Sequence, residues 1–297
     1  MQTARLMVLD VETIPTGNKK IEKCIREEAW NKEVAKNKSK ELKAEWNTET
    51  ACRERAEKAF RDTAKQPLHA QICTVCGLAL PVSAIPEIGA QVVVHNKENT
   101  LKCYQTKTGM EFAMLEFVAE WLNERATQNS VWIGHNIGFD LGCLLNSWRR
   151  LQITPPKHFP RYIRSSWRGR TFDTMNSTPT GTFKDLIKLD ELAELHGINA
   201  KSLEYKKQKM DGSLVYEAFL DGQYEFLQSY CWQDVETALQ LYLVQTSGDQ
   251  WGTYQATESA GEQIRAIKEA FKAGTLTETQ MRCSVFAIME KAGLLPA

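Results

Sequence analysis

The stretch Leu6-Met-Val-Leu-Asp-Val-Glu-Thr-Ile-Pro15 decides the fold class of this chain. Its apolar start predicts a buried β-strand, and Pro15 ends that strand because proline cannot donate to a sheet ladder. Side chains two residues apart on a strand point to the same face, so Asp10 and Glu12 lie side by side. Such close carboxylates repel each other unless a cation lies between them. Taken alone, the pair is better explained as an ordinary strand-end turn.

The composition is that of a globular protein without a charge bias. The 297 residues are 42% apolar and 25% charged with a formal net charge of zero, so any nucleic-acid surface must be local. We find no signal-peptide pattern and no run of about 18 apolar residues, so we expect a cytoplasmic protein that does not enter a membrane. Scattered cysteines fit reduced thiols, and Cys73 and Cys76 lack the further ligands of a structural zinc site.

Strands come first along the chain, and strands then alternate with helices. Residues 16–66 are rich in charge, and we expect one or two exposed helices there, inserted outside the core. The predicted strands cover 6–9, 72–80, 91–95, 131–133 and 171–175, and the predicted helices cover 110–122, 139–148, 186–196 and 222–244. This order predicts a three-layer α/β fold with a mixed sheet.

We expect the domain boundary near residue 245. Residues 1–245 would form the α/β domain, with 16–66 as a charged helical insertion, and 246–297 would form a helical extension. The stretch Thr246-Ser-Gly-Asp-Gln-Trp-Gly252 fits a linker. Beyond it, helical spacing of apolar residues and the capping pattern Thr277-Glu-Thr-Gln280 predict two helices.

Two further motifs carry candidate catalytic groups. In Gly134-His-Asn-Ile-Gly-Phe-Asp140 a strand leads into a glycine-containing turn, and Asp140 stands at the start of a helix, where aspartate is also a common cap. In Tyr230-Cys-Trp-Gln-Asp234 the tyrosine and the aspartate are four residues apart and share one helix face. Each motif alone also fits a structural role.

The order and spacing of the three motifs resemble the DEDD exonuclease superfamily, which has a ribonuclease H-like fold and includes polymerase proofreading domains and ribonuclease D. Asp-x-Glu, Asn-x-x-x-Asp and Tyr-x-x-x-Asp follow one another in the family order across residues 5–245. Ser229 stands where one branch carries histidine, so Tyr230 indicates the tyrosine branch, DEDDy. Residues 9–15 resemble predicted exonucleases related to the proofreading domain of family B DNA polymerases. The long insertion and the C-terminal tail depart from that pattern.

The resemblance implies a 3′→5′ exonuclease that hydrolyses the terminal phosphodiester of single-stranded DNA with two divalent ions, Mg²⁺ or Mn²⁺. The implied metal ligands are Asp10, Glu12, Asp140 and Asp234. Tyr230 would orient the attacking water, and Thr13 and Asn136 would contact the terminal nucleotide. His135 is expected to be structural, because the tyrosine already fills the water-orienting role.

A local substrate surface is predicted after the second motif. Residues 141–172 contain no aspartate or glutamate, but they contain six arginines and Lys157, interleaved with Trp148, Phe159, Tyr162 and Trp167. Cations and aromatic faces together suit a single strand. The residues expected to bind it are Arg161, Arg164, Trp167 and Arg168. The alternative is a solvated loop whose aromatics belong to the core.

Two alternative functions stay open. The substrate could be RNA, since proteins distinguish RNA through the ribose 2′-hydroxyl and no feature of this sequence reports that contact. A non-catalytic nucleic-acid-binding or polymerase-associated subunit is the second, although all four carboxylates and the tyrosine are present. The expected partners are single-stranded 3′ ends, with a polymerase or another replication or repair protein as a further candidate.

Overall fold

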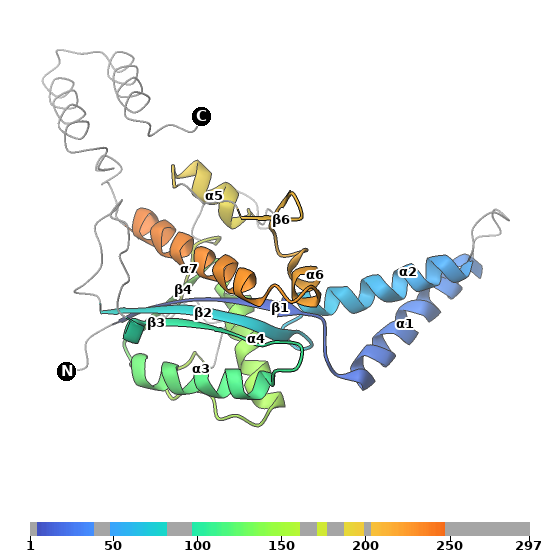
Figure 1. The fold of residues 1–297 in the computed structure, drawn as a ribbon, viewed down its shortest axis with the longest axis horizontal. Coiled ribbons are helices and arrows are strands. Elements are labelled where there is room, and N and C mark those ends of the chain that lie inside the picture. Colours follow the sequence, from blue (N-terminus) through green and yellow to red (C-terminus); the bar gives the residue numbers. More distant parts are fainter. Residues whose placement is uncertain are drawn as a thin grey trace, which may run out of the picture.

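A five-stranded mixed sheet forms the centre of the molecule (Figure 1). The computed structural model describes residues 5–38, 48–81, 97–160, 171–176, 187–198 and 203–246. The strand order is β3-β2-β1-β4-β5, with β1 antiparallel to β2 and parallel to β4. The strands are β1 (Arg5–Ile14), β2 (Gln71–Pro81), β3 (Thr100–Tyr104), β4 (Val131–Gly134) and β5 (Thr171–Asp173). The mixed sheet and the α/β class are therefore confirmed.

Helices cover both faces of this sheet, which makes three layers (Figure 1). One face packs against α3 (Glu111–Arg125) and α4 (Ile137–Arg150), and the other packs against α7 (Tyr224–Thr246). The side of α7 also carries α5 (Leu189–Leu195), α6 (Val215–Leu220) and the strands β6 (Glu204–Tyr205) and β7 (Gln208–Lys209). The arrangement is consistent with a ribonuclease H-like topology.

The alternation of β1 decides which face each of its side chains occupies. Met7 and Leu9 are buried with the residues of α3 and α4, whereas Leu6 and Val8 are buried with those of α7. The even-numbered positions continue that second face, which places Asp10 and the glutamate two residues later toward α7. The register of β1 with β2 shifts immediately after that glutamate, where the ladder is locally irregular.

A glycine allows the second motif to approach β1. A Cβ atom on Gly134 would lie 3.0 Å from the carbonyl oxygen of Leu9 and 2.7 Å from Cδ1 of Ile137. Asn136 follows with a left-handed φ of 61° and precedes the first turn of α4. The turn between β4 and α4 is therefore pressed against the strand that carries the first motif.

Two packed helices occupy the charged stretch after β1. They are α1 (Lys19–Lys38) and α2 (Thr48–Arg61), and α2 continues into the 3-10 turn η1 (Asp62–Lys65). We call α1, α2 and η1 the helical hairpin, and it projects beyond one end of the sheet (Figure 1). Part of the charge forms ion pairs one helical turn apart, which suits solvent-exposed helices.

Several predicted boundaries differ from the observed ones. Strand β3 was not predicted because, of its five residues, only Leu101 is buried, as is typical of an edge strand. Within α3, Phe112 is 40% exposed, whereas Met114 and Trp121 are buried. The predicted strand at 91–95, the linker and the C-terminal helices lie outside the described residues. In the described part of the chain, no helix is both long and apolar enough to span a membrane.

The predicted end of α5 is confirmed by its hydrogen bonds. Gly197 adopts a left-handed φ of 69° after the last turn of the helix. Its N–H donates to the carbonyl of Glu194 at 2.9 Å, and the N–H of Ile198 donates to that of Ala193 at 2.8 Å. This paired arrangement is a Schellman motif, which glycine favours because it has no Cβ.

The joint between the helical hairpin and β1 gives a stability prediction. Thr63 is fully buried, its hydroxyl donates to the carbonyl of Phe60 at 2.7 Å and accepts the N–H of Thr16 at 3.0 Å. Thr63→Val keeps the shape but leaves that N–H unpaired, so the free energy of unfolding should fall by about 1–3 kcal/mol. The exposed control Thr154→Val should change it by less than about 0.5 kcal/mol. Equal denaturation midpoints for the two variants would contradict this role.

Candidate metal centre

Three carboxylates converge where β1 meets α7. Asp10, Glu12 and Asp234 each offer an oxygen atom, and these atoms all lie within 4.8 Å of one another. Tyr230 stands one turn before Asp234 on α7, as the spacing predicted. The first and third motifs, more than 200 residues apart in the sequence, therefore form one site.

The fourth carboxylate reaches the same region from α4. Asp140 is 3% exposed and accepts a backbone hydrogen bond from Val11. Asp140 is not one of the three acids whose oxygens lie within 4.8 Å of one another. Burial raises its pKa, and the charges of Asp10 and Asp234 raise it further. The second motif thus brings its aspartate to the side of the site that faces α4.

Burial and mutual repulsion disfavour the charged forms of these acids. Burial raises the pKa of Asp10 to about 6. Burial also raises the pKa of Glu12 well above its usual range, and the charges of Asp10, Asp234 and Asp140 raise it further. The pKa of Asp234 is raised by burial and by Asp10, and a hydrogen bond with Tyr230 opposes the shift. A cation bound among these carboxylates would favour their charged forms and lower their pKa values.

The unpaired oxygens give a direct test of whether a cation fits. Within the described residues, Oδ2 of Asp10 and Oδ2 of Asp140 are buried and have no hydrogen-bond partner. A buried acceptor without a partner is costly, and native proteins usually satisfy it. Carboxylate oxygens are ligands that suit Mg²⁺ or Mn²⁺. The residues present therefore fit divalent metal binding.

Tyr230 is held in its protonated form. Burial raises the pKa of its hydroxyl above the ordinary value of 10, and the charges of Glu12, Asp234 and Asp10 add to the shift. At neutral pH the side chain therefore acts as a hydrogen-bonding group and not as a base.

Buried thiols connect the strands to α7 and to each other. The thiol of Cys231 on α7 donates to the carbonyl oxygen of Asp10 at 3.4 Å, and Cys76 on β2 donates to that of Gln228 at 3.5 Å. Cys73 donates to the carbonyl oxygen of Glu12 at 3.3 Å. All three side chains are buried, and their contacts hold the backbone beside the carboxylates.

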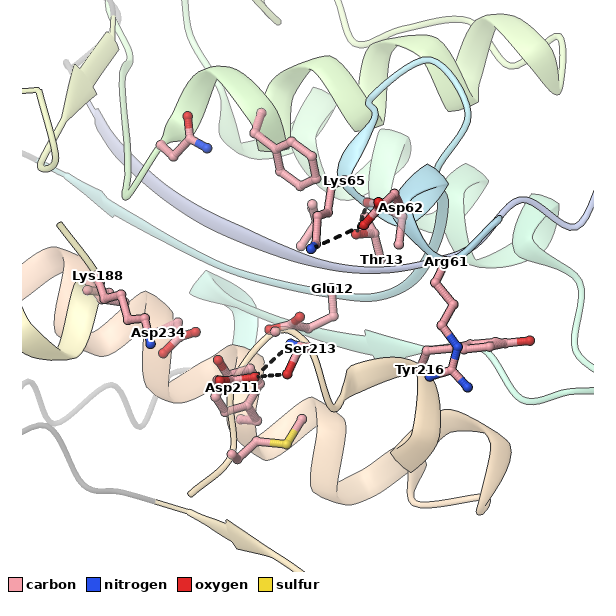
Figure 2. A pocket seen from close by; sticks show the side chains of 18 of the residues that line it. Glu12, Thr13, Arg61, Asp62, Lys65, Lys188, Asp211, Ser213, Tyr216 and Asp234 are labelled. Atoms are coloured by element: carbon pink, nitrogen blue, oxygen red, sulfur yellow. Dashed lines mark hydrogen bonds and ion pairs between the residues drawn. The ribbon is translucent and has the colours of Figure 1, made fainter. Parts of the chain in front are cut away.

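Glu12 and Asp234 line a cleft of about 1310 Å³ (Figure 2). Thr13, Asn136 and Tyr230 line it as well. The helical hairpin lines it on one side, and the segment from β7 to α6 lines it on another. Its cationic lining residues are Arg53, Lys58, Arg61, Lys65, Lys188 and Lys209.

Of the six residues predicted to contact the nucleic acid, two lie in the described part of the chain, Thr13 and Asn136. The hydroxyl of Thr13 donates to the carbonyl of Ala64 at 2.7 Å, which ties β1 to η1. Asn136 is exposed and lines the cleft, while its backbone N–H donates to Asp173 at 2.9 Å. The other four residues of this prediction, Arg161, Arg164, Trp167 and Arg168, lie outside the described residues.

Two aromatic residues of the predicted substrate surface belong to the core. Trp148 and Phe159 pack edge to face, with ring centroids 4.8 Å apart, and both are buried. The indole N–H of Trp148 donates to the carbonyl of Leu115 at 3.0 Å. In the described part of the 141–172 stretch, the alternative of core aromatics is therefore correct for these two side chains.

His135 has structural partners on both ring nitrogens. Nδ1 lies 3.0 Å from the hydroxyl of Thr174, and Nε2 lies 2.8 Å from the carbonyl oxygen of Ile187. Burial lowers its pKa, which favours the neutral ring. These contacts join β4 to the chain after β5 and before α5, in line with the expected structural role.

A further carboxylate was missed in the sequence. Asp173 ends β5, its Oδ1 accepts the N–H groups of Asn136 and Met175, and its charge raises the pKa of Asp140. It therefore supports the turn that leads into α4. The available signal was its position at the carboxyl end of a strand parallel to β4, where ligand-binding side chains gather.

Removal of metal should expose the repulsion within the site. Because the pKa of Asp10 is raised in the folded state, protonation of this acid stabilises the fold. That stabilisation is complete below the usual pKa of 3.8 and is lost as the pH rises through about 6. In EDTA the melting temperature should fall across that window. Asp10→Asn removes the titrating group, so the variant should melt higher than wild type in EDTA at neutral pH.

Metal addition provides the matching measurement. Mn²⁺ should stabilise wild type by about 3 kcal/mol at roughly 100 times its dissociation constant, because it binds the folded state alone. The gain should be much smaller for Asp10→Asn. A variant that melts below wild type in EDTA, or that gains equally from Mn²⁺, would argue against a metal site here.

No family model matches the sequence, and no curated protein matches it either. The functional assignment therefore depends on the site itself. The site combines four carboxylates, of which Glu12 and Asp140 are buried and Asp10 and Asp234 are partly exposed, with a protonated tyrosine and an open cleft with cations on its sides.

Proposed function

We propose that this protein is a metal-dependent 3′→5′ exonuclease of the DEDDy type that hydrolyses the terminal phosphodiester of a single DNA strand. The observation that carries the proposal is the convergence of Asp10, Glu12 and Asp234, with Asp140 and Tyr230 beside them. These are the residues of the three sequence motifs, and the fold brings together side chains that are far apart in the chain. The direction of degradation follows from the motif resemblance.

The chemistry of the donor set supports phosphodiester hydrolysis. Two divalent ions, when bound, make water nucleophilic and stabilise the leaving oxygen. Asp10, Glu12, Asp140 and Asp234 would hold them, since two of these acids have buried oxygens without another partner. Tyr230 keeps its proton and faces the same cleft, so its hydroxyl is suited to orient the attacking water.

The depth of the site favours a strand end over the middle of a duplex. Glu12 and Asp140 are only 8% and 3% exposed. A phosphodiester reaches them most readily when its strand is unpaired and enters through the open cleft. The half-buried ring of Phe139, next to Asp140, also lines this cleft.

Hydrolysis of end-labelled strands tests the proposal and the role of the shared acid. Wild type with Mg²⁺ or Mn²⁺ should shorten 5′-labelled single-stranded DNA stepwise and release mononucleotide from 3′-labelled DNA, and EDTA should stop both. Asp10→Asn should lower the rate more than about 100-fold, beyond the 10- to 100-fold typical of residues that only support ligands. Activity that persists in EDTA would rule out the metal mechanism. Faster hydrolysis of matched RNA would assign the site to RNA.

The hydroxyl of Tyr230 has a smaller expected effect. Tyr230→Phe removes the water-orienting group and leaves all four carboxylates in place, so the turnover rate should fall roughly 10- to 100-fold. The Mn²⁺ concentration that gives half-maximal activity should change far less than the turnover rate, because only one hydrogen bond to Asp234 is lost. A loss as large as that of Asp234→Ala, or no loss, would contradict an orienting role.

A further inference from the structure

The helical hairpin is fixed to the strand that carries the metal ligands. Thr13, directly after Glu12, donates its hydroxyl to the carbonyl of Ala64 in η1 at 2.7 Å. Three residues later the N–H of Thr16 donates to the hydroxyl of Thr63 at 3.0 Å. The position of η1 relative to the metal centre is therefore set by contacts within a few residues of the carboxylates.

A second set of contacts holds α2 against α6. The ring of Phe60 packs edge to face on that of Tyr216, with centroids 6.2 Å apart. Arg61 lies over the same tyrosine ring and pairs with Glu217 at 3.5 Å. The hairpin is thus held from two directions, so its side chains keep a defined place at the cleft.

The same cleft contains both the metal ligands and one face of the hairpin. Residues of α2 and η1 line it together with Glu12 and Asp234. Figure 2 shows Lys65 and Arg61 on the hairpin side of Glu12. Its volume of about 1310 Å³ exceeds the roughly 300–1,000 Å³ of a site for one small ligand. The space therefore extends well beyond what a single terminal nucleotide needs.

Two lysines on the cleft side of the hairpin have at most a weak ion pair among the described residues and can meet phosphates. Glu57 on this face is neutralised by Arg26 at 2.7 Å and by Arg61 at 3.2 Å. Lys65 pairs with Asp62 at 3.5 Å across an exposed turn, which is a weak interaction. Lys58 has no ion pair among the described residues, and it stands seven positions before Lys65. Both lysines line the cleft.

We propose that α2 and η1 form a side of the substrate channel, and that Lys58 and Lys65 contact phosphates of the strand upstream of its reacting end. The occupant is a single nucleic-acid strand, because the buried Glu12 in this cleft is reached most readily by an unpaired end. The inference rests on the proposed exonuclease function and assigns the charged insertion to substrate binding.

The test compares a cleft-side pair with a matched pair on the outside of the same hairpin. The cleft variant is Lys58→Ala with Lys65→Ala, and the control is Lys20→Ala with Arg55→Ala. The two control residues are exposed and do not line the cleft. Both proteins lose two positive charges, so a difference between them reports position and not net charge. Each is made in wild type and in the Asp10→Asn protein, in which the strand should survive a binding measurement.

Binding is measured by fluorescence anisotropy with a short labelled single-stranded DNA and Mg²⁺ at several salt concentrations. Each phosphate contact on a single strand contributes about 0.7 to the slope of log affinity against log salt, so the cleft variant should lose about 1.4 and bind about tenfold more weakly at low salt. The control should keep the wild-type slope. Thermal melting should be the same for both, since all four lysine and arginine side chains are exposed.

The outcomes separate this inference from the proposed function. Suppose that wild type hydrolyses the strand. If the cleft variant then keeps the wild-type salt dependence of binding, or if the control variant loses as much of it, the assignment of α2 and η1 to the substrate channel is overturned and the exonuclease function stands. If the slope falls in the cleft variant alone but wild type never hydrolyses DNA or RNA, the binding surface stands and the exonuclease is overturned. If wild type neither binds nor hydrolyses, both are overturned.

Discussion

Repulsion between buried carboxylates is the constraint on which the centre of this molecule depends. Glu12 is disfavoured in its charged form by burial and by three neighbouring aspartates, and two aspartate oxygens have no partner among the described residues. Such a cluster stays together only when each acid is fixed by an element that other contacts stabilise. Here β1 is paired on both sides, α4 starts from the end of β4, and α7 packs across the sheet. The metal-free site is therefore held by the surrounding core.

The core shows how α7 is held against that repulsion. Val235 and Leu239 are buried against Leu6 and Val8, and each such side chain contributes about 1.5–3 kcal/mol. The thiol of Cys231 adds a contact to the backbone of β1 itself. Apolar packing beyond the site thus offsets a local electrostatic cost, and divalent ions would remove that cost. A site of this kind gains stability from its ligand, which makes binding and folding thermodynamically linked.

The sequence predicted what depends on periodicity and on short spacings. The period of two on β1 places Asp10 and Glu12 on one face of the strand, and the four-residue spacing places Tyr230 and Asp234 on one face of α7. In the structure these two faces meet. Strand β3 was missed because edge strands bury little, and the place of Asp173 depends on which strands are neighbours in the sheet. The aromatic rings of Trp148 and Phe159 could equally have served a surface or a core, since composition alone does not report burial. Long-range neighbours of this kind are set by tertiary packing.

The position of the charged insertion follows from the same reasoning. It leaves the sheet after Asp10 and Glu12, the candidate metal ligands of β1, so the chain that would hold ions is continuous with the chain that would guide a strand. Thr13 and Thr16 attach η1 within four residues of Glu12, and a displacement of the hairpin would therefore pull on the ligand backbone itself. An insertion at a distant loop could vary without effect on catalysis. This one cannot move far without altering the metal centre, because a rigid support is what keeps reacting groups in register. The hairpin that would hold substrate is thus attached to the strand that would hold the ions.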